Sequence, residues 1–241
     1  MSNMSTSTTA PARSRTVGWV VGALVVALTA VVVGLVMWVE GRESDADPAM
    51  SSEAITPATG IPTGAGGVAG TVNDGAPLLE VYFDPMCSYC VLLDTVNHDT
   101  FAQLRDDGEV TLVYHPVSFM ETGFDGARSD MLAAAVAAVA HEAPEVLDAF
   151  VATLMAHQAL TMNGLDAEGL RVVAVNAGVT QDVIAVLGQE RYVQWVQEAA
   201  DEMEARSGMR ATPQLWLDGQ VLEVDWMDPQ NVVDAVRGAG A

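Results

Sequence analysis

The hydrophobic pattern divides the chain into three parts. Residues 17–39 form an uncharged apolar run of 23 residues, which is long enough to cross a bilayer as a helix. Residues 40–76 are rich in Pro, Gly, Ala, Ser and Thr and have no helical periodicity, although 68–72 could form a short edge strand. We therefore predict a cytoplasmic tail at 1–16, a transmembrane anchor at 17–39, a flexible linker at 40–76 and a folded domain at 77–241.

Strand and helix patterns alternate from residue 77 onward. The apolar run at 78–83 predicts a buried strand, the helical spacing after Cys90 predicts a helix, and 110–114 predict a second strand. One crossover between two such strands implies that they are parallel. Residues 126–207 are predicted to be almost wholly helical, in segments at 131–140, 144–157, 167–176, 180–187 and 189–206.

The C-terminal pattern predicts a hairpin and one more helix. Asp218 and Gly219 separate two apolar runs at 214–217 and 221–224, which is a strong hairpin signal. Asp228 as N-cap and Pro229 at the first helical position begin the last helix. The whole pattern predicts an α/β fold in which residues 126–207 are almost wholly helical.

The two cysteines of the chain, Cys87 and Cys90, stand where the first strand pattern gives way to a helical one. This position puts the first sulfur beside unpaired backbone N–H groups and the positive end of the helix dipole, which favours the reactive thiolate. The second sulfur is close enough to close a short disulfide and release a bound partner. We predict a thiol–disulfide exchange site, in which Cys87 is exposed with a lowered pKa and Cys90 is more buried.

A structural disulfide, a metal site and a redox-inert binding module agree less well with this pair of cysteines. A disulfide that closes so small a loop is a poor staple, and a zinc site needs about four ligands. The four histidines show no ligand spacing, so no metal site is predicted; they are His98, His115, His141 and His157. A soft-metal chaperone remains an alternative because the chain has 12 methionines, including Met86 and Met209, although core packing accounts for most of them. A redox-inert binding module is disfavoured because both cysteines are intact.

The charge distribution bears on partners and location. From Glu40 onward the chain has 8 Arg, no Lys and 32 acidic residues, a formal charge of −24, so we expect no nucleic-acid partner. Arg13 and Arg15 precede the apolar run and acidic residues follow it, which predicts a cytoplasmic N-terminus and an extracytoplasmic domain in a single-pass membrane protein. A cleaved signal peptide is the rival interpretation, but its apolar core is normally shorter and ends at a small-residue cleavage site.

Two segments resemble the DsbA-like family of thioredoxin-fold thiol–disulfide oxidoreductases, especially its membrane-anchored actinobacterial members. The first is Asp-Pro-Met-Cys-Ser-Tyr-Cys at 84–90, and the second, after the helical insertion, is Ala-Thr-Pro-Gln-Leu-Trp-Leu-Asp-Gly at 211–219. The likeness covers about 77–238. It implies a thioredoxin-like core with a mixed sheet, an inserted helical subdomain, and a cis-proline at Pro213 that faces Cys87.

The resemblance also implies the reaction and its partners. Substrate contacts are expected from four residues around the sulfurs: Ser88, Tyr89, Thr212 and Pro213. No cofactor is expected beyond the redox-active disulfide between Cys87 and Cys90. The partners would be client proteins with free thiols or disulfides and a quinone-linked membrane protein that reoxidises the pair, and the catalytic domain is expected to be a monomer.

The sequence also departs from the family pattern. The dipeptide between the cysteines is Ser88-Tyr89, whereas family members commonly have Pro first and the strongly oxidising type has His second. Without that histidine the pair is expected to be a weaker oxidant. Tyr89 resembles isomerase sites, but 40–76 are too short for the dimerisation domain of such isomerases. Glu80 is out of register for the buried acid of this fold, and the direction of exchange stays open between oxidase, which we favour, reductase and isomerase.

Overall fold

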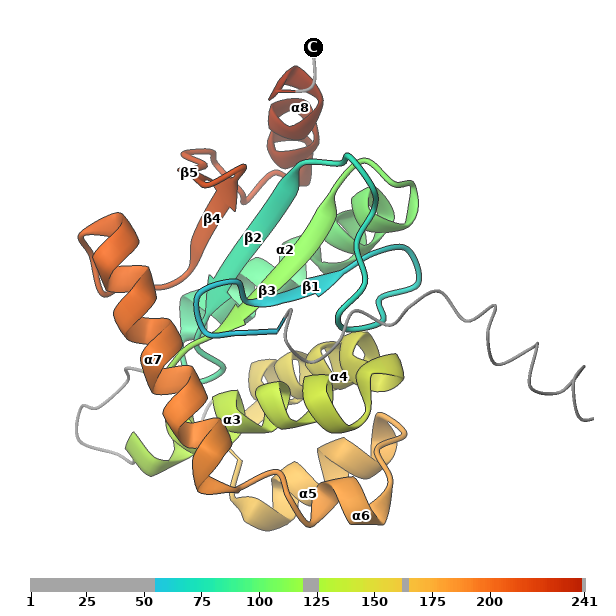
Figure 1. Cartoon of the computed structure of the whole chain (residues 1–241), viewed down its shortest axis with the longest axis vertical. Helices are drawn as coiled ribbons and strands as arrows, with labels where there is room; N and C mark the ends of the chain where they lie inside the picture. Colours follow the sequence, from blue (N-terminus) through green and yellow to red (C-terminus); the bar gives the residue numbers. More distant parts are fainter. Residues whose placement is uncertain (1–54, 119–125, 162–164, 240–241) are drawn as a thin grey trace, which may run out of the picture. The chain divides into compact units, whose positions relative to one another are not determined.

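The sheet at the centre of the structure has five strands in the order β1-β3-β2-β4-β5 (Figure 1). The computed structural model describes residues 55–118, 126–161 and 165–239. Strands β2 and β3 run parallel, and the other neighbours are antiparallel, so the sheet is mixed as predicted. The strands are β1 (Ile61–Thr63), β2 (Leu78–Phe83), β3 (Thr111–Pro116), β4 (Gln214–Leu217) and β5 (Gln220–Val221).

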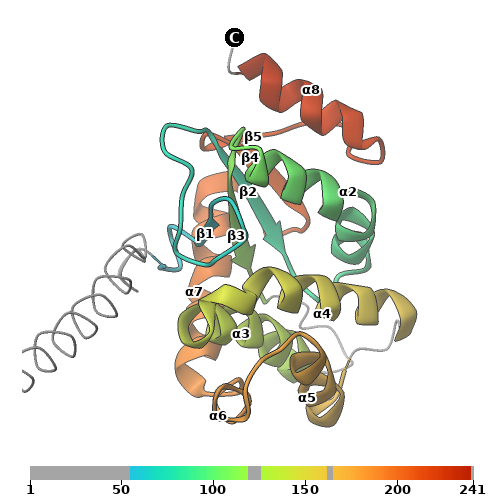
Figure 2. The same cartoon turned by 90° about the vertical axis from the view of Figure 1, so that its right-hand side faces the viewer.

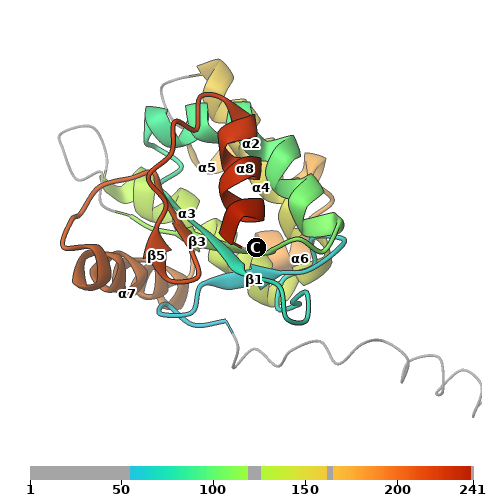
Figure 3. The same ribbon diagram turned by 90° about the horizontal axis from the view of Figure 1, so that it is seen from above.

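Helices cover both faces of the sheet. Helix α2 (Ser88–Asp106) connects β2 to β3 and lies beside α8 (Pro229–Ala239) on one face, while α7 (Glu190–Ser207) lies on the other (Figures 2 and 3). Because successive side chains of a strand point to opposite faces, β2 sends Leu79, Val81 and Phe83 into the core under α2. Its other face sends Glu80 and Tyr82 toward α7. The active-site helix and α7 are therefore on opposite sides of the sheet.

The helical insertion lies between β3 and α7, so it is shorter than the predicted 126–207, whose last part is α7 on a face of the sheet. Its elements are α3 (Gly126–Glu142), η2 (Pro144–Val146), α4 (Leu147–Thr161), α5 (Ala167–Asn176) and α6 (Gln181–Ile184), which group together below the sheet in Figure 1. Every residue from Leu132 to Ala140 is at most 1% exposed. An alanine- and valine-rich helix that is apolar nearly all round can be buried in this way, so α3 is the centre of the insertion.

The prediction of a flexible linker up to residue 76 is wrong for 55–76. Strand β1 pairs with β3, with Ile61 opposite Tyr114, and the predicted edge strand at 68–72 contributes only one isolated bridge, from Ala69 to Thr63. The Asn73 side chain donates two hydrogen bonds of 2.6 Å to main-chain carbonyls at the end of α2 and the start of β3. The ordered domain therefore begins by Ile55, which is buried, and not near Pro77.

Two smaller differences concern strand lengths. The second hairpin strand is only Gln220–Val221, because after Leu222 donates its N–H to Leu215 the chain turns away from the sheet toward α8. The strand predicted at 110–114 begins at Thr111 and continues to Pro116.

Helix α8 begins as predicted, and the Asp228 carboxylate accepts a hydrogen bond of 3.0 Å from the N–H of Gln230 in its first turn.

The predicted tail at 1–16, the anchor at 17–39 and the linker residues 40–54 lie outside the described residues. Within the described ranges, every helix is too short or too polar to cross a bilayer. The anchor thus remains a sequence-based expectation.

Candidate active site

A tight turn after β2 brings Cys87 to the start of α2. The Asp84 side chain is fully buried, and its Oδ1 accepts a hydrogen bond of 2.8 Å from the N–H of Met86. The Asp84 carbonyl accepts one of 2.9 Å from the N–H of Cys87. Cys87 then occupies the N-cap position of α2 with extended backbone angles, φ −80° and ψ 119°. Its sulfur therefore lies where a helix offers unpaired N–H groups.

The surroundings of the two sulfurs give them different pKa values. A hydrogen bond from the Cys90 thiol, aided by the N–H groups of Cys90 and Tyr89 and the Thr212 hydroxyl, outweighs burial and lowers the pKa of Cys87 to about 6. Burial, the hydrogen bond to Cys87 and the charge there raise the pKa of Cys90 well above its ordinary value. At neutral pH the pair therefore holds its negative charge on Cys87, which is the better nucleophile and the better leaving group.

The prediction of an exposed Cys87 is wrong. Cys87 is 7% exposed and Cys90 1%, so both are buried. The reason is the segment that precedes β4, since the Thr212 carbonyl oxygen lies 3.5 Å from Cys87 Sγ. The family resemblance predicted that this segment faces Cys87, which the structure confirms, but the expectation of an exposed sulfur did not allow for its cover.

The segment at 208–213 joins α7 to β4 and is shaped by its own hydrogen bonds. Gly208 ends α7 with φ 71°, a left-handed conformation that glycine adopts without a steric penalty. The side-chain amide of Gln214 donates a hydrogen bond of 2.8 Å to the Ala211 carbonyl. The bond between Thr212 and Pro213 is cis. These contacts hold the Thr212 carbonyl against Cys87.

The other residues predicted to contact substrate lie near the surface. Ser88 and Tyr89, in the first turn of α2, are exposed, and Tyr89 is 64% exposed. Thr212 and Pro213 are partly buried. The Thr212 carbonyl therefore lies against Cys87 directly. Ser88 and Tyr89 lie near the sulfurs because they stand between the two cysteines in the chain.

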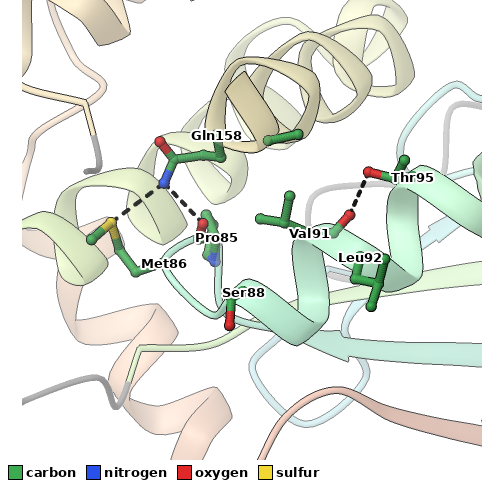
Figure 4. Close-up of a pocket in the computed structure, with 8 residues that line it drawn as sticks. Pro85, Met86, Ser88, Val91, Leu92, Thr95 and Gln158 are labelled. Atoms are coloured by element: carbon green, nitrogen blue, oxygen red, sulfur yellow. Dashed lines mark hydrogen bonds between the residues drawn. The ribbon is translucent and has the colours of Figure 1, made fainter. Parts of the chain in front are cut away.

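The helical insertion holds the active-site turn through two contacts that the sequence analysis missed. Ser129, on α3, donates a hydrogen bond of 2.6 Å from its hydroxyl to Asp84 Oδ2. Gln158, on α4, donates from its amide to the Pro85 carbonyl at 3.0 Å and to Met86 Sδ at 3.4 Å (Figure 4). These partners are 45 and 73 positions away along the chain, and no local pattern signals them.

The space behind Cys90 is mostly apolar. A void of about 10 Å³ there is lined by side chains that include Phe83, Leu93 and Phe101, and Asp94 supplies a carboxylate to the lining. Asp94 lies four residues after Cys90, on the same face of α2, and is 3.2 Å from His98. Asp94 and Cys90 line the same void, whereas Glu80 lies on the opposite face of the sheet, as its register indicated.

Glu80 belongs to a buried charge cluster between β2, β3 and α7. Arg206 binds both oxygens of Glu80, at 2.8 and 3.0 Å, and His115 Nε2 lies 3.0 Å from Glu80 Oε2. Burial acts to raise the pKa of Glu80, but the bonds from His115 and Arg206 prevail and lower it to about 2. Arg206 is near the end of α7, so this pair ties the helix that leads into 208–213 to the strand that leads to Cys87.

Among the residues that the structure describes, no three His, Cys, Asp or Glu side chains lie together in a way that could hold a metal ion. The sulfurs, the helix start and the Thr212 segment together define a thioredoxin-type Cys-X-X-Cys arrangement. A family model described as thioredoxin matches residues 73–235, and the chain therefore belongs to this thioredoxin family.

Solved structures with the same fold include thiol–disulfide oxidoreductases of actinobacteria. MdbA of Actinomyces oris is 23% identical with a TM-score of 0.59, and the match covers 76% of this chain and 99% of that one. DsbA of Mycobacterium tuberculosis is 22% identical with a TM-score of 0.61, covering 74% and 91%. DsbG of the same organism is 22% identical with a TM-score of 0.62, covering 78% and 90%. A comparison with curated protein sequences finds no match. The fold of the chain is thus that of the DsbA and MdbA proteins.

Proposed function

We propose that the protein is a membrane-tethered thiol–disulfide oxidoreductase that donates the disulfide between Cys87 and Cys90 to secreted or cell-envelope proteins. The observation that carries this proposal is the pair of unequal sulfurs. Cys87 is at the start of α2 with its pKa lowered to about 6, next to a buried Cys90 and the Thr212 carbonyl. The DsbA and MdbA fold supports the same activity.

The reaction proceeds by two thiolate attacks. A client thiolate attacks Cys87 Sγ, the bond between Cys87 and Cys90 breaks, and its electron pair goes to Cys90 Sγ. Cys90 then takes a proton, because its pKa is raised. A second client thiolate attacks the client sulfur of the mixed disulfide, and Cys87 leaves as a thiolate. The client loses two electrons and gains a disulfide, and the two cysteines of the protein are reduced.

The low pKa of Cys87 favours transfer of the disulfide from the protein to the client. Folding lowers this pKa from the ordinary 9.0 to about 6, which stabilises the reduced protein fully above about pH 9. This stabilisation declines between pH 9 and pH 6 and is lost as the pH falls below 6. A stabilised reduced form makes the disulfide a better oxidant. Reoxidation would come from a quinone-linked membrane partner. A reductase or isomerase would use the same residues, so the reduction potential decides between them.

The full-length oxidised protein in lipid nanodiscs is expected to form disulfides in a reduced, unfolded client. Its reduction potential, measured by equilibration with glutathione, is expected to be less negative than about −200 mV, because a stable Cys87 thiolate favours the reduced form. A potential near −270 mV, about that of thioredoxin, would instead indicate a reductase. Failure to exchange with either a client or glutathione would overturn the proposed activity.

The cysteine domain is expected outside the cytoplasm, because Arg13 and Arg15 precede the predicted anchor and acidic residues follow it. Protease added to intact spheroplasts should release a fragment that contains Cys87. A cytoplasmic marker protein serves as the control and should remain intact. If the fragment appears only after the membrane is lysed, the proposed orientation is wrong.

A further inference from the structure

Gln214 is the first residue of β4 and comes directly after the cis bond between Thr212 and Pro213. It is 8% exposed, so both ends of its side-chain amide need partners inside the protein. Its nitrogen donates to the Ala211 carbonyl at 2.8 Å and to the Met209 carbonyl at 3.4 Å. One side chain of the strand therefore holds two carbonyl groups of the segment that precedes it.

The orientation of this amide is set by Trp216, two residues along β4. The Trp216 indole N–H donates a buried hydrogen bond of 3.1 Å to Gln214 Oε1. Because an indole N–H can only donate, it draws the amide oxygen to its own side and turns the amide nitrogen toward the segment. Arg206 lies 4.4 Å from the centroid of the Trp216 ring and is itself bound by Glu80. The donor that Gln214 offers is thus fixed from the sheet.

The segment held in this way covers the sulfur that a client attacks. The Thr212 carbonyl oxygen is 3.5 Å from Cys87 Sγ, and Cys87 is only 7% exposed. Attack on a sulfur this enclosed requires the segment to move. Such a movement separates Gln214 from the Ala211 carbonyl, and it leaves a buried amide nitrogen without its nearest acceptor, which costs free energy.

Small thiols and polypeptide thiols differ in what they offer in return. A small thiol such as 2-mercaptoethanol makes few contacts beyond its sulfur, so nothing replaces the hydrogen bonds that are lost when the segment shifts. An extended polypeptide carries backbone N–H groups, which can pair with the carbonyls of Met209 and Ala211. Both residues are exposed, so a client can reach them. Contacts made by remote parts of a substrate can offset the cost of a conformational change.

We propose that Gln214 is a positioning residue that keeps the segment at 208–213 closed over Cys87 and so makes the exchange selective for polypeptide thiols over small thiols. Gln214 does not touch the reacting sulfurs; it acts through Ala211 and Thr212. The closed segment keeps small thiols from reducing the disulfide before a client arrives. This inference rests on the proposed function, because it concerns the same two sulfurs.

Gln214→Met tests this role, because methionine keeps the length of the side chain and removes both the donor and the acceptor. The full-length oxidised protein in lipid nanodiscs is mixed with 2-mercaptoethanol or with an unfolded alanine-rich peptide that carries one cysteine. Rates of mixed-disulfide formation are compared at equal thiolate concentration. The readout is the ratio of the peptide rate to the small-thiol rate, in which a general change in Cys87 reactivity cancels. This ratio is expected to fall about tenfold, the equivalent of one hydrogen bond, as the small thiol gains access.

Asn73→Leu is the matched control for a loss of stability. The Asn73 side-chain amide also donates to two backbone carbonyls, both at 2.6 Å, but it does so at the start of β3, away from the sulfurs. Asn73→Leu should lower the urea midpoint of unfolding and leave the rate ratio at its wild-type value. An equal fall of the ratio in Asn73→Leu and Gln214→Met would overturn the positioning role.

Gln214→Glu gives a signature that a merely structural role would not produce. The carboxylate still accepts from Trp216, but its second oxygen faces the Ala211 carbonyl and cannot donate until it is protonated. The rate ratio should therefore be low at about pH 8 and rise toward the wild-type value at about pH 5, because burial raises the pKa of a carboxyl above its ordinary value of about 4.3. A ratio in this variant that does not change with pH would show that the amide donor does not hold the segment.

The outcomes separate the two proposals. If the oxidised wild-type protein reacts with neither 2-mercaptoethanol nor the peptide, the proposed function fails. If both react and the ratio in Gln214→Met equals that of the wild-type protein, only the role of Gln214 is overturned. If Gln214→Met does not fold, Gln214→Glu, which keeps the bond to Trp216, decides by its pH dependence alone.

Discussion

Cys87→Ser is expected to abolish disulfide exchange, whereas Cys90→Ser is expected to trap clients as mixed disulfides on Cys87. The reason is the unequal environment of the two sulfurs: Cys87 has a pKa lowered to about 6, and Cys90 is 1% exposed with a raised pKa. Without Cys90, this chain has no second thiol of its own to resolve the mixed disulfide, so release depends on a second client thiol alone. Non-reducing electrophoresis of each reduced variant with a disulfide-bonded client would measure the trapped species, because the Cys87 thiolate can displace one client sulfur as a thiolate without any further oxidant. Equal trapping by both variants would contradict the assignment of Cys87 as the attacked sulfur.

The pH dependence of alkylation follows from the same difference. In the reduced wild-type protein, the alkylation rate of Cys87 should be half-maximal near pH 6, while Cys90 should not reach its plateau below pH 9. At pH 7, where a thiol with a pKa of 9 or more is at most about 1% thiolate, Cys87 should react about a hundredfold faster. Mass spectrometry of quenched samples would assign the modified residue.

Arg206→Met is expected to lower the free energy of unfolding by about 3–5 kcal/mol at pH 7, because it leaves the buried carboxylate of Glu80 without its cation. In the wild-type protein the pKa of Glu80 is lowered to about 2, so this stabilisation is present above about pH 4.5 and is lost as the pH falls toward 2. The deficit of the variant should therefore shrink in acid. Denaturant titrations of the full-length protein at pH 7 and pH 3 would measure it.

Two further variants control for the location of the charge. Arg237 pairs with Glu109 at 2.8 Å, but Arg237 is largely exposed, so Arg237→Met should change the free energy of unfolding little. Adding Glu80→Gln to Arg206→Met should recover part of the loss, because the neutral amide has no uncompensated charge. A deficit for Arg206→Met no larger than that for Arg237→Met would show that the buried pair does not stabilise the sheet against α7.

The elements around the cysteines could be predicted because their signals are local. The apolar run that became β2 and the Asp-Gly hairpin signal after β4 are each contained in a few residues, and both strands have their predicted bounds. The segment at 55–76 was missed because its apolar positions are sparse. Its strand has three residues and includes Pro62, and Ile55, Ile61 and Ala69 are buried by packing against distant parts of the chain.

The sulfur pair could be recognised from spacing, but most of its surroundings could not. The local residues alone left the isomer of the Thr212 to Pro213 bond open; the family resemblance predicted a cis bond facing Cys87, 125 positions away, and the structure confirms it. The contacts of Asp84 could likewise be predicted only in part. Its hydrogen bond to Met86 is local in the sequence, whereas Ser129 reaches it from α3 only when the insertion folds. Contacts of this kind depend on tertiary packing, which periodicity does not encode.

The two edges of the sheet bear on the proposed reaction with unfolded client chains. An exposed strand edge is a template for aggregation, and unfolded clients present many segments that would pair with it. Here the edge strands are β1, with three residues including Pro62, and β5, with two residues. Proline removes a backbone donor, and strands this short offer few groups to pair. A client can therefore be held at the sulfurs with little risk that it extends the sheet and co-precipitates with the protein.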